Sequence, residues 1–319
     1  MKQMADVETT TSSRPPLTSL LMAPLAAVWS ERFAFIIRRQ ALQATRMRVD
    51  DFYDRHPISE HEVLAAVARR RGGDLSQLSP DDLFEFDQDH YGGLQAVDEL
   101  ASRAGIATAS HVLDVCAGLG GPARFLASRR RCRVLALEHH AGRAAGAARL
   151  NRLVGLDGQV RTVRGDATAL PFRDGSFNAC VSQEAFLHVA DKLAALAGCH
   201  RVLVPGGRLA FTDWIAHATL GERERARLAE WMAATTLQSL EGYRALLGRA
   251  GFVGVESEDL SDEWRSILRA RLARLRAMRR DMAARLGEAR FGEYEQLYAF
   301  FVGLVEEGKL GGGRFSGSA

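Results

Sequence analysis

Short apolar runs alternate with stretches of helical spacing from residue 111 onward. The six runs that indicate strands are residues 111–116, 133–138, 159–164, 177–182, 208–214 and 252–257. Runs of this length, separated by segments long enough to form helical crossovers, are typical of a parallel sheet in an α/β protein. Near the end of the chain, the run GGGRFSG predicts a last, short edge strand.

The regions that flank this alternation show different patterns. Residues 1–16 are polar, rich in Thr and Ser and end in two prolines, which predicts a disordered tail. Residues 17–105 have a mostly helical pattern and predict a helical N-terminal region that acts as a lid. We assign residues 106–319 to the main domain and expect a helical insertion over about 220–310 to cap it, since apolar residues recur there at helical spacing.

Charge and cysteine content exclude several classes of partner. The 42 basic and 39 acidic residues are interspersed and give a net charge of +3, so we expect no nucleic-acid partner. The four cysteines have no metal-site spacing, which favours reduced thiols, a cytoplasmic location and no metal. The apolar run 17–29 is shorter than the about 20 residues that cross a bilayer. It predicts a packing or homo-oligomer helix and no membrane span.

The stretch LDVCAGLGGPAR, residues 113–124, breaks an apolar run with glycines before a helical pattern resumes. In an open α/β sheet, a glycine turn after the first strand lets the backbone approach a bound ligand closely. A dinucleotide fingerprint would need a third glycine at position 123, where this chain has alanine, and a phosphate loop is also absent. The turn by itself is therefore compatible with several nucleotide ligands.

Three carboxylates, each near the end of one of three successive predicted strands, narrow the choice among nucleotide ligands. Asp114, just before the glycines, suits an ammonium group, and Glu138 ends the second strand where a carboxylate accepts hydrogen bonds from ribose hydroxyls. Asp166, in RGDATALPF, is placed to accept from an adenine amino group. An adenosine that bears an ammonium group and no phosphate is S-adenosylmethionine, which we expect as the methyl donor.

The runs VLDVCAGLGGPARFLA, GDATALPF, SQEAFLHV, RVLVPGG and AFTDW resemble the class I S-adenosylmethionine-dependent methyltransferases. Within them, the chain resembles the group that includes sarcosine/dimethylglycine N-methyltransferases and phosphoethanolamine methyltransferases. The resemblance covers roughly residues 87–257. It implies an α/β fold with a Rossmann-like, seven-stranded, mostly parallel sheet, helices on both faces, and helical caps from the N-terminal region and the C-terminal insertion.

The resemblance also implies a set of cofactor contacts. In such enzymes the first-strand acid and the glycines hold the methionyl end, the second acid holds the ribose, and the Asp-Ala pair meets the adenine. The lead-in DQDHYGG, residues 87–93, contacts the methionyl carboxylate, and the start of SQEAFLHV faces the methionyl moiety. The matching positions are Asp114, Gly118, Gly120, Glu138, Asp166, Ala167, Tyr91, Gly92, Gly93, Ser182 and Gln183.

Two catalytic residues follow from the same resemblance. His188 matches a histidine that lies beside the acceptor and pairs with a lid tyrosine in the phosphoethanolamine branch. Tyr53 is the nearest candidate for that tyrosine, although it lies farther from Gly92 and Gly93 than those enzymes would suggest, and the sequence identifies no arginine or lysine clamp for a phosphate.

The expected reaction is an in-line methyl transfer to a small-molecule substrate in a covered pocket. An amine acceptor must lose a proton, for which His188 is suited. Asp213 and Trp214 would line the acceptor side, where rings and carboxylates favour a cationic amine, whereas Trp231 is expected to pack in the core. Two alternatives remain open. One is S-, O- or C-methylation of a thioether such as methionine, a natural product or a lipid, and the other is a non-catalytic S-adenosylmethionine-binding module.

Overall fold

The computed structural model describes residues 49–56 and 58–319. Two predictions lie wholly outside this part: the disordered tail at 1–16 and the packing or homo-oligomer helix at 17–29. The predicted helical region at 17–105 is described only from residue 49. Among the residues that are described, no helix is both long enough and apolar enough to cross a membrane.

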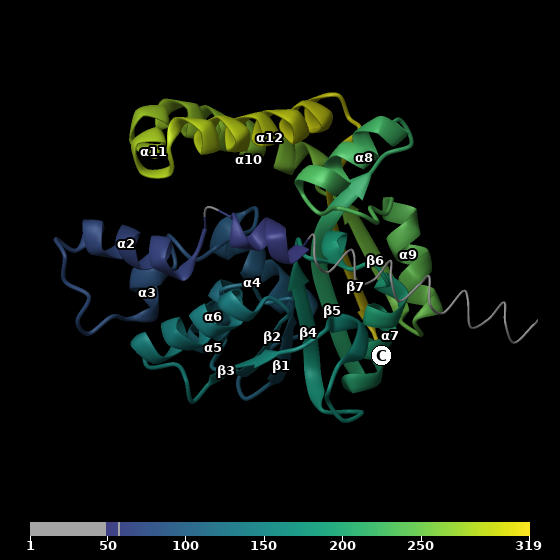
Figure 1. Ribbon diagram of the computed structural model, residues 1–319. Helices are drawn as coiled ribbons and strands as arrows, with labels where there is room; N and C mark the ends of the chain where they lie inside the picture. Colours follow the sequence, from purple (N-terminus) through teal and green to yellow (C-terminus); the bar gives the residue numbers. More distant parts are fainter. Residues whose placement is uncertain (1–48, 57) are drawn as a thin grey trace, which may run out of the picture. The chain divides into compact units, whose positions relative to one another are not determined.

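A seven-stranded sheet with the order β3-β2-β1-β4-β5-β7-β6 forms the centre of the fold (Figure 1). Strands β1 to β5 pair in parallel, whereas β7 runs antiparallel to both β5 and β6. The strands are β1 (His111–Val115), β2 (Arg133–Glu138), β3 (Val160–Arg164), β4 (Phe177–Gln183), β5 (Leu203–Ala216), β6 (Val253–Asp259) and β7 (Leu310–Ser318). The predicted Rossmann-like, mostly parallel sheet is therefore confirmed.

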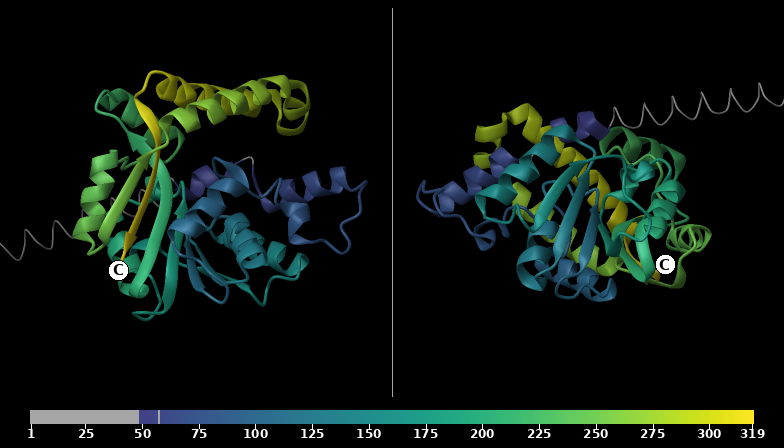
Figure 2. Two further views of the ribbon diagram at one scale, coloured as in Figure 1. Left: turned by 180° about the vertical axis from the view of Figure 1, so that it is seen from behind. Right: turned by 90° about the horizontal axis from the view of Figure 1, so that it is seen from below.

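The central strands are buried on both faces, which explains their nearly continuous apolar sequences. On β1, Val112 packs into one apolar cluster and Leu113 into another, because successive side chains of a strand point to opposite faces. The first cluster is covered by α4 (Gly93–Arg103), α5 (Gly121–Arg130) and α6 (Ala141–Leu153). The second is covered by α7 (Lys192–Val202) and α9 (Leu240–Arg249). Figure 2 shows these helix layers on the two sides of the sheet.

The C-terminal strand departs from prediction. The GGGRFSG run was expected to form an edge strand, but β7 lies between β5 and β6, and β6 forms the edge. The glycines there have a packing role, because a Cβ atom on Gly312 would lie 2.2 Å from the ring of Trp264. They make room for a tryptophan that the local sequence does not indicate.

Helices lie beyond the end of the sheet at which the parallel strands finish (Figure 1). Between β6 and β7 the chain forms α10 (Ser261–Ala277), α11 (Arg279–Leu286) and α12 (Glu288–Glu306). From the N-terminal side come a helical segment at 49–54, α2 (Glu60–Arg70) and the short α3 (Pro80–Leu83). Helix α8 (Glu222–Trp231) follows β5. Within the predicted helical insertion at about 220–310, α9 packs on the sheet and β6 is its edge strand.

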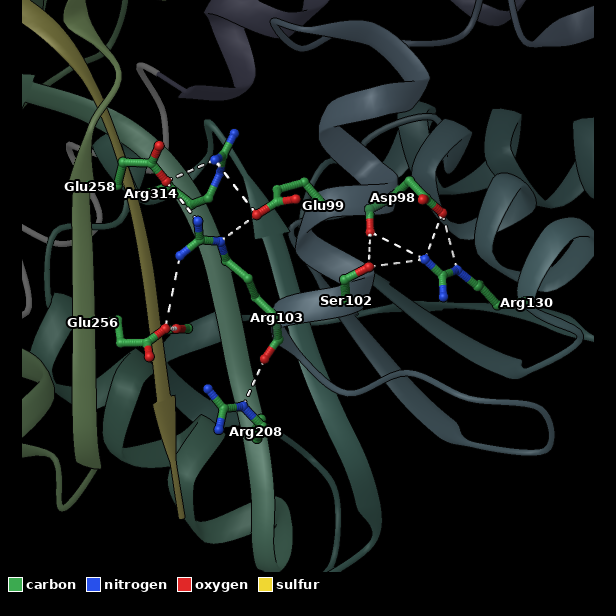
Figure 3. A network of polar contacts seen from close by, with 10 residues as sticks. Asp98, Glu99, Ser102, Arg103, Arg130, Arg208, Glu256, Glu258 and Arg314 are labelled. Atoms are coloured by element: carbon green, nitrogen blue, oxygen red, sulfur yellow. Dashed lines mark hydrogen bonds and ion pairs between the residues drawn. The ribbon is translucent and has the colours of Figure 1, made fainter.

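A charged network ties α4 to the far strands of the sheet (Figure 3). Arg103 donates to Glu99 at 2.7 Å and to Glu258 at 2.8 Å, and Arg314 of β7 donates to the same Glu258 at 2.9 Å. Glu256 lies 3.9 Å from Arg103. Because α4 begins directly after Gly92, this network holds the helix that follows the lead-in segment.

Candidate functional site

The glycine turn after β1 has a backbone that requires glycine. Gly118 and Gly120 have φ angles of 59° and 76°. The amide of Gly118 donates to Glu138 Oε2 at 2.8 Å. A Cβ atom on Gly118 would lie 2.7 Å from Arg143 Nη2, so a side chain there would displace that guanidinium. Cys116 adopts the left-handed region at φ 61° without being glycine, a conformation that costs roughly 1 kcal/mol.

Asp114 presents an unsatisfied carboxylate oxygen at this turn. Its side chain is buried, and Oδ2 has no hydrogen-bond partner among the described residues. Burial and, secondarily, the negative charge of Glu138 raise the pKa of Asp114 to about 8. Since a buried oxygen of this kind is costly unless it is paired, the position fits a bound cationic group.

Glu138 and Asp166 lie at the carboxyl ends of the next two strands. Glu138 ends β2, and its carboxylate accepts from the amides of Gly118 and, at 2.7 Å, His140. Asp166 precedes the short helix η1 (Ala167–Ala169) and accepts from the amide of Thr168 at 2.9 Å. Strand order reverses between β1 and its neighbours β2 and β4, which is where open α/β sheets bind ligands. The structure therefore brings the three predicted carboxylates to one end of the sheet.

The two predicted residues at the end of β4 differ in their surroundings. The hydroxyl of Ser182 donates to the carbonyl of Val115 at 2.8 Å, so that side chain joins β4 to β1. Gln183 has a buried Nε2 without a hydrogen-bond partner in the described part of the chain. Of the two side chains, only that of Gln183 keeps a donor for a ligand.

A buried ion pair fixes the lead-in segment 87–93 against the glycine turn. Arg124, fully buried on α5, donates to Asp87 Oδ2 from Nη2 at 2.9 Å and from Nε at 3.1 Å. The carbonyl oxygen of Asp87 packs so closely on α5 that a Cβ atom on Gly121 would lie 2.1 Å from it. Tyr91, Gly92 and Gly93 follow directly, the two glycines with φ angles of 81° and 56°. Sequence reasoning missed Arg124, although it closes the stretch LDVCAGLGGPAR.

The helical segment at 49–54 packs over the same turn through Arg143. The guanidinium of Arg143 lies 4.5 Å from the centre of the Tyr53 ring and donates to Asp89 Oδ2 at 2.9 Å. His140 Nε2 lies 3.0 Å from Asp54. These contacts place Tyr53 beside the glycine turn, and burial raises the pKa of its hydroxyl.

Tyr53 and His188 are brought together, as the resemblance implied. Their ring centres lie 5.4 Å apart at an interplanar angle of 71°. His188 Nδ1 lies 3.3 Å from the carbonyl oxygen of Ala233, and because a carbonyl only accepts, Nδ1 carries the hydrogen and Nε2 is left as an acceptor. Burial lowers the pKa of His188 to about 4, so its ring is neutral at neutral pH.

A cavity of about 490 Å³ lies next to this pair. Its wall is largely aromatic and apolar, with Phe52, Tyr53, Tyr91, Leu187, Trp214, Met232, Tyr294, Leu297, Tyr298 and Phe301. The predicted substrate residue Trp214 is part of this wall. Trp231 instead lines an adjoining hollow of about 710 Å³.

Asp213 does not line this cavity. It precedes Trp214 on β5 and therefore points to the opposite face of the strand. There it is fully buried and accepts a hydrogen bond from the hydroxyl of Tyr243. Of the two predicted substrate residues, Trp214 and not Asp213 reaches the cavity, because alternation along a strand brings only one of two neighbouring residues to a given face.

Glu184 is a cavity residue that sequence reasoning missed, although it lies within SQEAFLHV. Its carboxylate accepts from the amide of Tyr91 and from the hydroxyl of Thr212, both at 2.8 Å. Burial raises its pKa to about 8. Its left-handed backbone, with φ 46°, is the kind of local strain that is found at functional sites.

Comparison with known proteins supports the fold and identifies a methyltransferase domain within the chain. Residues 113–211 match the family described as "Methyltransferase domain". The chain is 31% identical over 168 residues to the glycine/sarcosine/dimethylglycine N-methyltransferase of Actinopolyspora halophila, covering 53% of this chain and 30% of that protein. It is 32% identical over 169 residues to the sterol 24-C-methyltransferase of Eremothecium gossypii, covering 51% of this chain and 45% of the relative.

Among solved structures, the phosphoethanolamine N-methyltransferase 2 of Haemonchus contortus superimposes with a TM-score of 0.70 at 20% identity, over 85% of this chain and 59% of that one. The matched part of the chain spans less than two thirds of the length of the curated relatives named above. The family match, these relatives and the sheet order agree with one another. Residues 113–211 therefore form a methyltransferase domain, and the chain resembles the S-adenosylmethionine-dependent methyltransferases in sequence and in fold.

Proposed function

We propose that the protein transfers a methyl group from S-adenosylmethionine to a small-molecule acceptor, with an amine or amino acid nitrogen as the first candidate. When bound, S-adenosylmethionine supplies a methyl group on a positively charged sulfur. The observation that carries the proposal is the buried Oδ2 of Asp114 next to the glycine turn, which has no hydrogen-bond partner among the described residues. It fits the methionyl ammonium, while Glu138 fits the ribose and Asp166 with Ala167 fits the adenine.

The chain's own residues would orient the acceptor and exclude water. The cavity next to His188 and Tyr53 is lined from the segment around residue 53, from α2 and from α10 to α12, so it is enclosed from several sides. Exclusion of water and alignment of the nucleophile are the main requirements of this reaction. The neutral Nε2 of His188 can accept a hydrogen bond from an N–H group of the acceptor and so orient its lone pair toward the methyl group.

The acidic and aromatic side chains of the cavity support an amine acceptor. Glu184 lies in the wall with Tyr91 and Trp214. A cation that approaches Glu184 would lower its raised pKa and ionise it, and the rings would stabilise the same positive charge. These features are the reason why nitrogen is the first candidate atom.

A second candidate is C-, O- or S-methylation of a larger natural product or lipid. The observation that favours it is the size of the cavity, about 490 Å³ with methionine and aromatic walls, which exceeds the needs of a glycine derivative. The named relatives include both an N-methyltransferase and a sterol C-methyltransferase. We also propose that the protein acts in the cytoplasm, which its four free cysteines support.

The test is a mass-spectrometric screen for a product that gains one methyl group. The acceptor panel contains glycine derivatives, ethanolamine bases, thioethers including methionine, sterols and phenols. Formation of one S-adenosylhomocysteine per methylated product would support the proposal. Binding of S-adenosylmethionine with no product from any class would instead support a non-catalytic binding module.

The role of His188 is tested by His188→Ala against the control His111→Ala, which changes an exposed histidine at the start of β1. We expect His188→Ala to lower turnover and to change the affinity for S-adenosylhomocysteine by less than about twofold. His111→Ala should change neither. Full turnover by His188→Ala would remove this histidine from the mechanism.

A further inference from the structure

Three of the arginines in the wall of the cavity have no ion-pair partner among the described residues, although four acids line the same cavity. Arg69 of α2 and Arg271 and Arg274 of α10 line the cavity, and none of them makes an ion pair within the described part of the chain. Arg271 and Arg274 are three residues apart on one helix, so they lie on the same face. Cations that are grouped in a cavity without an ion-pair partner favour a negatively charged ligand.

The acids that line the same cavity are already engaged. Glu62 pairs with Arg285, Glu85 pairs with Arg70 at 2.9 Å, and Asp89 pairs with Arg143 at 2.9 Å. The remaining acid, Glu184, holds the amide of Tyr91 and the hydroxyl of Thr212. Burial raises its pKa to about 8, which makes it largely neutral at pH 7.

Arg271 is held in place but keeps donors for a ligand. One of its five N–H groups donates to the carbonyl oxygen of His90 at 2.6 Å, and its guanidinium lies 4.7 Å from the centre of the Tyr91 ring. The nearby cavity residue Tyr298 has a buried hydroxyl that lies beside Arg271 and Tyr91. A fixed guanidinium and a buried hydroxyl donor on one wall form a suitable subsite for an anion.

We propose that the cavity binds an acceptor with an apolar body and an anionic group, a carboxylate or a phosphate, which Arg271 and Tyr298 hold while Arg274 and Arg69 attract it at the mouth. The inference rests on the proposed function, because it assigns the same cavity to the acceptor. It deepens that function by requiring that the acceptor carry a negative charge away from the methylated atom. The aromatic wall accounts for the apolar body.

The test measures binding rather than turnover. Four probes share a phenylalkyl body and differ in their head group: phenylbutyrate, phenylpropylphosphonate, phenylbutanol and phenylbutylamine. Each is titrated into the full chain saturated with S-adenosylhomocysteine, and quenching of tryptophan fluorescence reports occupancy because Trp214 lines the cavity. Binding of S-adenosylhomocysteine is measured separately by calorimetry, so a failure of the proposed function is distinguished from a failure of this inference.

We expect at least one anionic probe to bind about tenfold more tightly than the alcohol or the amine. Preference for the phosphonate would identify a phosphate as the natural group, and preference for the butyrate would identify a carboxylate. Equal binding of the anionic and neutral probes, or tighter binding of the amine, would overturn the inference.

Substitutions of the cavity arginines test which side chains bind the anionic group. Arg271→Met should remove the anionic preference and leave affinity for the alcohol within about twofold. Arg274→Met changes an exposed side chain and should weaken the anionic probes by a smaller factor, which keeps the test valid if Arg271→Met fails to fold. The matched control is Arg276→Met on the same helix, because Arg276 pairs with Glu295 outside the cavity. An anionic preference that persists in both cavity variants would overturn the assignment.

Discussion

Replacing Asp114 by asparagine tests the cofactor site, because it should change the number of protons released when the ligand binds. With a pKa of about 8, Asp114 of the ligand-free protein is protonated in about nine-tenths of molecules at pH 7. An ammonium group that binds at Oδ2 would favour the carboxylate and lower this pKa. Binding of S-adenosylhomocysteine should therefore release close to one proton into the buffer.

The assay is calorimetry in two buffers of different ionisation enthalpy. At pH 7 the buffer dependence should correspond to about 0.9 proton released, and at pH 8 to about 0.5, since half of the Asp114 side chains are then already ionised. Asp114→Asn should bind more weakly and release no proton from this position. Asp157→Asn, at an exposed position, is the control and should behave as the wild type. A wild-type value near zero at pH 7, or an unchanged value in Asp114→Asn, would refute the reasoning.

Asp114→Asn should weaken ligand binding but stabilise the ligand-free protein. The folded-state pKa of Asp114 lies above the unfolded value of 3.8, so the folded protein binds this proton more tightly and loses stability as pH rises from about 4 to about 8. The shift corresponds to at most about 6 kcal/mol at 1.36 kcal/mol per pKa unit. Asp114→Asn should therefore raise the melting temperature of the ligand-free protein at pH 8 more than at pH 5.

Three further substitutions test the parts that support the site. Cys116→Gly should stabilise the protein by about 1 kcal/mol in urea unfolding, because glycine adopts φ 61° without a Cβ clash; lower stability would show that the thiol packing outweighs the strain. Arg124→Met should destabilise it by about 3 to 5 kcal/mol because Asp87 is left buried without its cation, and the added change Asp87→Asn should recover part of this loss. Arg103→Met should cost only about 1 kcal/mol, less at high salt, since its partners are partly exposed; a loss as large as that of Arg124→Met would contradict this view of the network.

The parts of the fold that the sequence predicted are those set by local pattern. Apolar runs gave the strands near their observed bounds, and the glycines with Asp114 and Glu138 gave the ligand end of the sheet. The position of β7 was not predictable, because it depends on pairing between β7 and two strands distant in sequence. The side chain that fills the space above Gly312, Trp264, comes from a helix before the strand.

In the candidate site too, features set by local sequence were predicted and features set by distant packing were not. Tyr53 and His188 meet as the resemblance implied, and their catalytic roles stay predictions. Asp213 and Trp214 could not be told apart from sequence, because a one-residue difference along a strand reverses the face. Arg271 gave no signal, since it meets Tyr91 only through the packing of α10 against the lead-in segment.

The central claim is that the end of the sheet at Asp114, Glu138 and Asp166 binds S-adenosylmethionine. Calorimetric titration of the purified chain with S-adenosylmethionine and with S-adenosylhomocysteine tests it most directly. The account predicts that both bind at one site per chain and that Asp114→Asn weakens both. Absence of binding by either compound would contradict it.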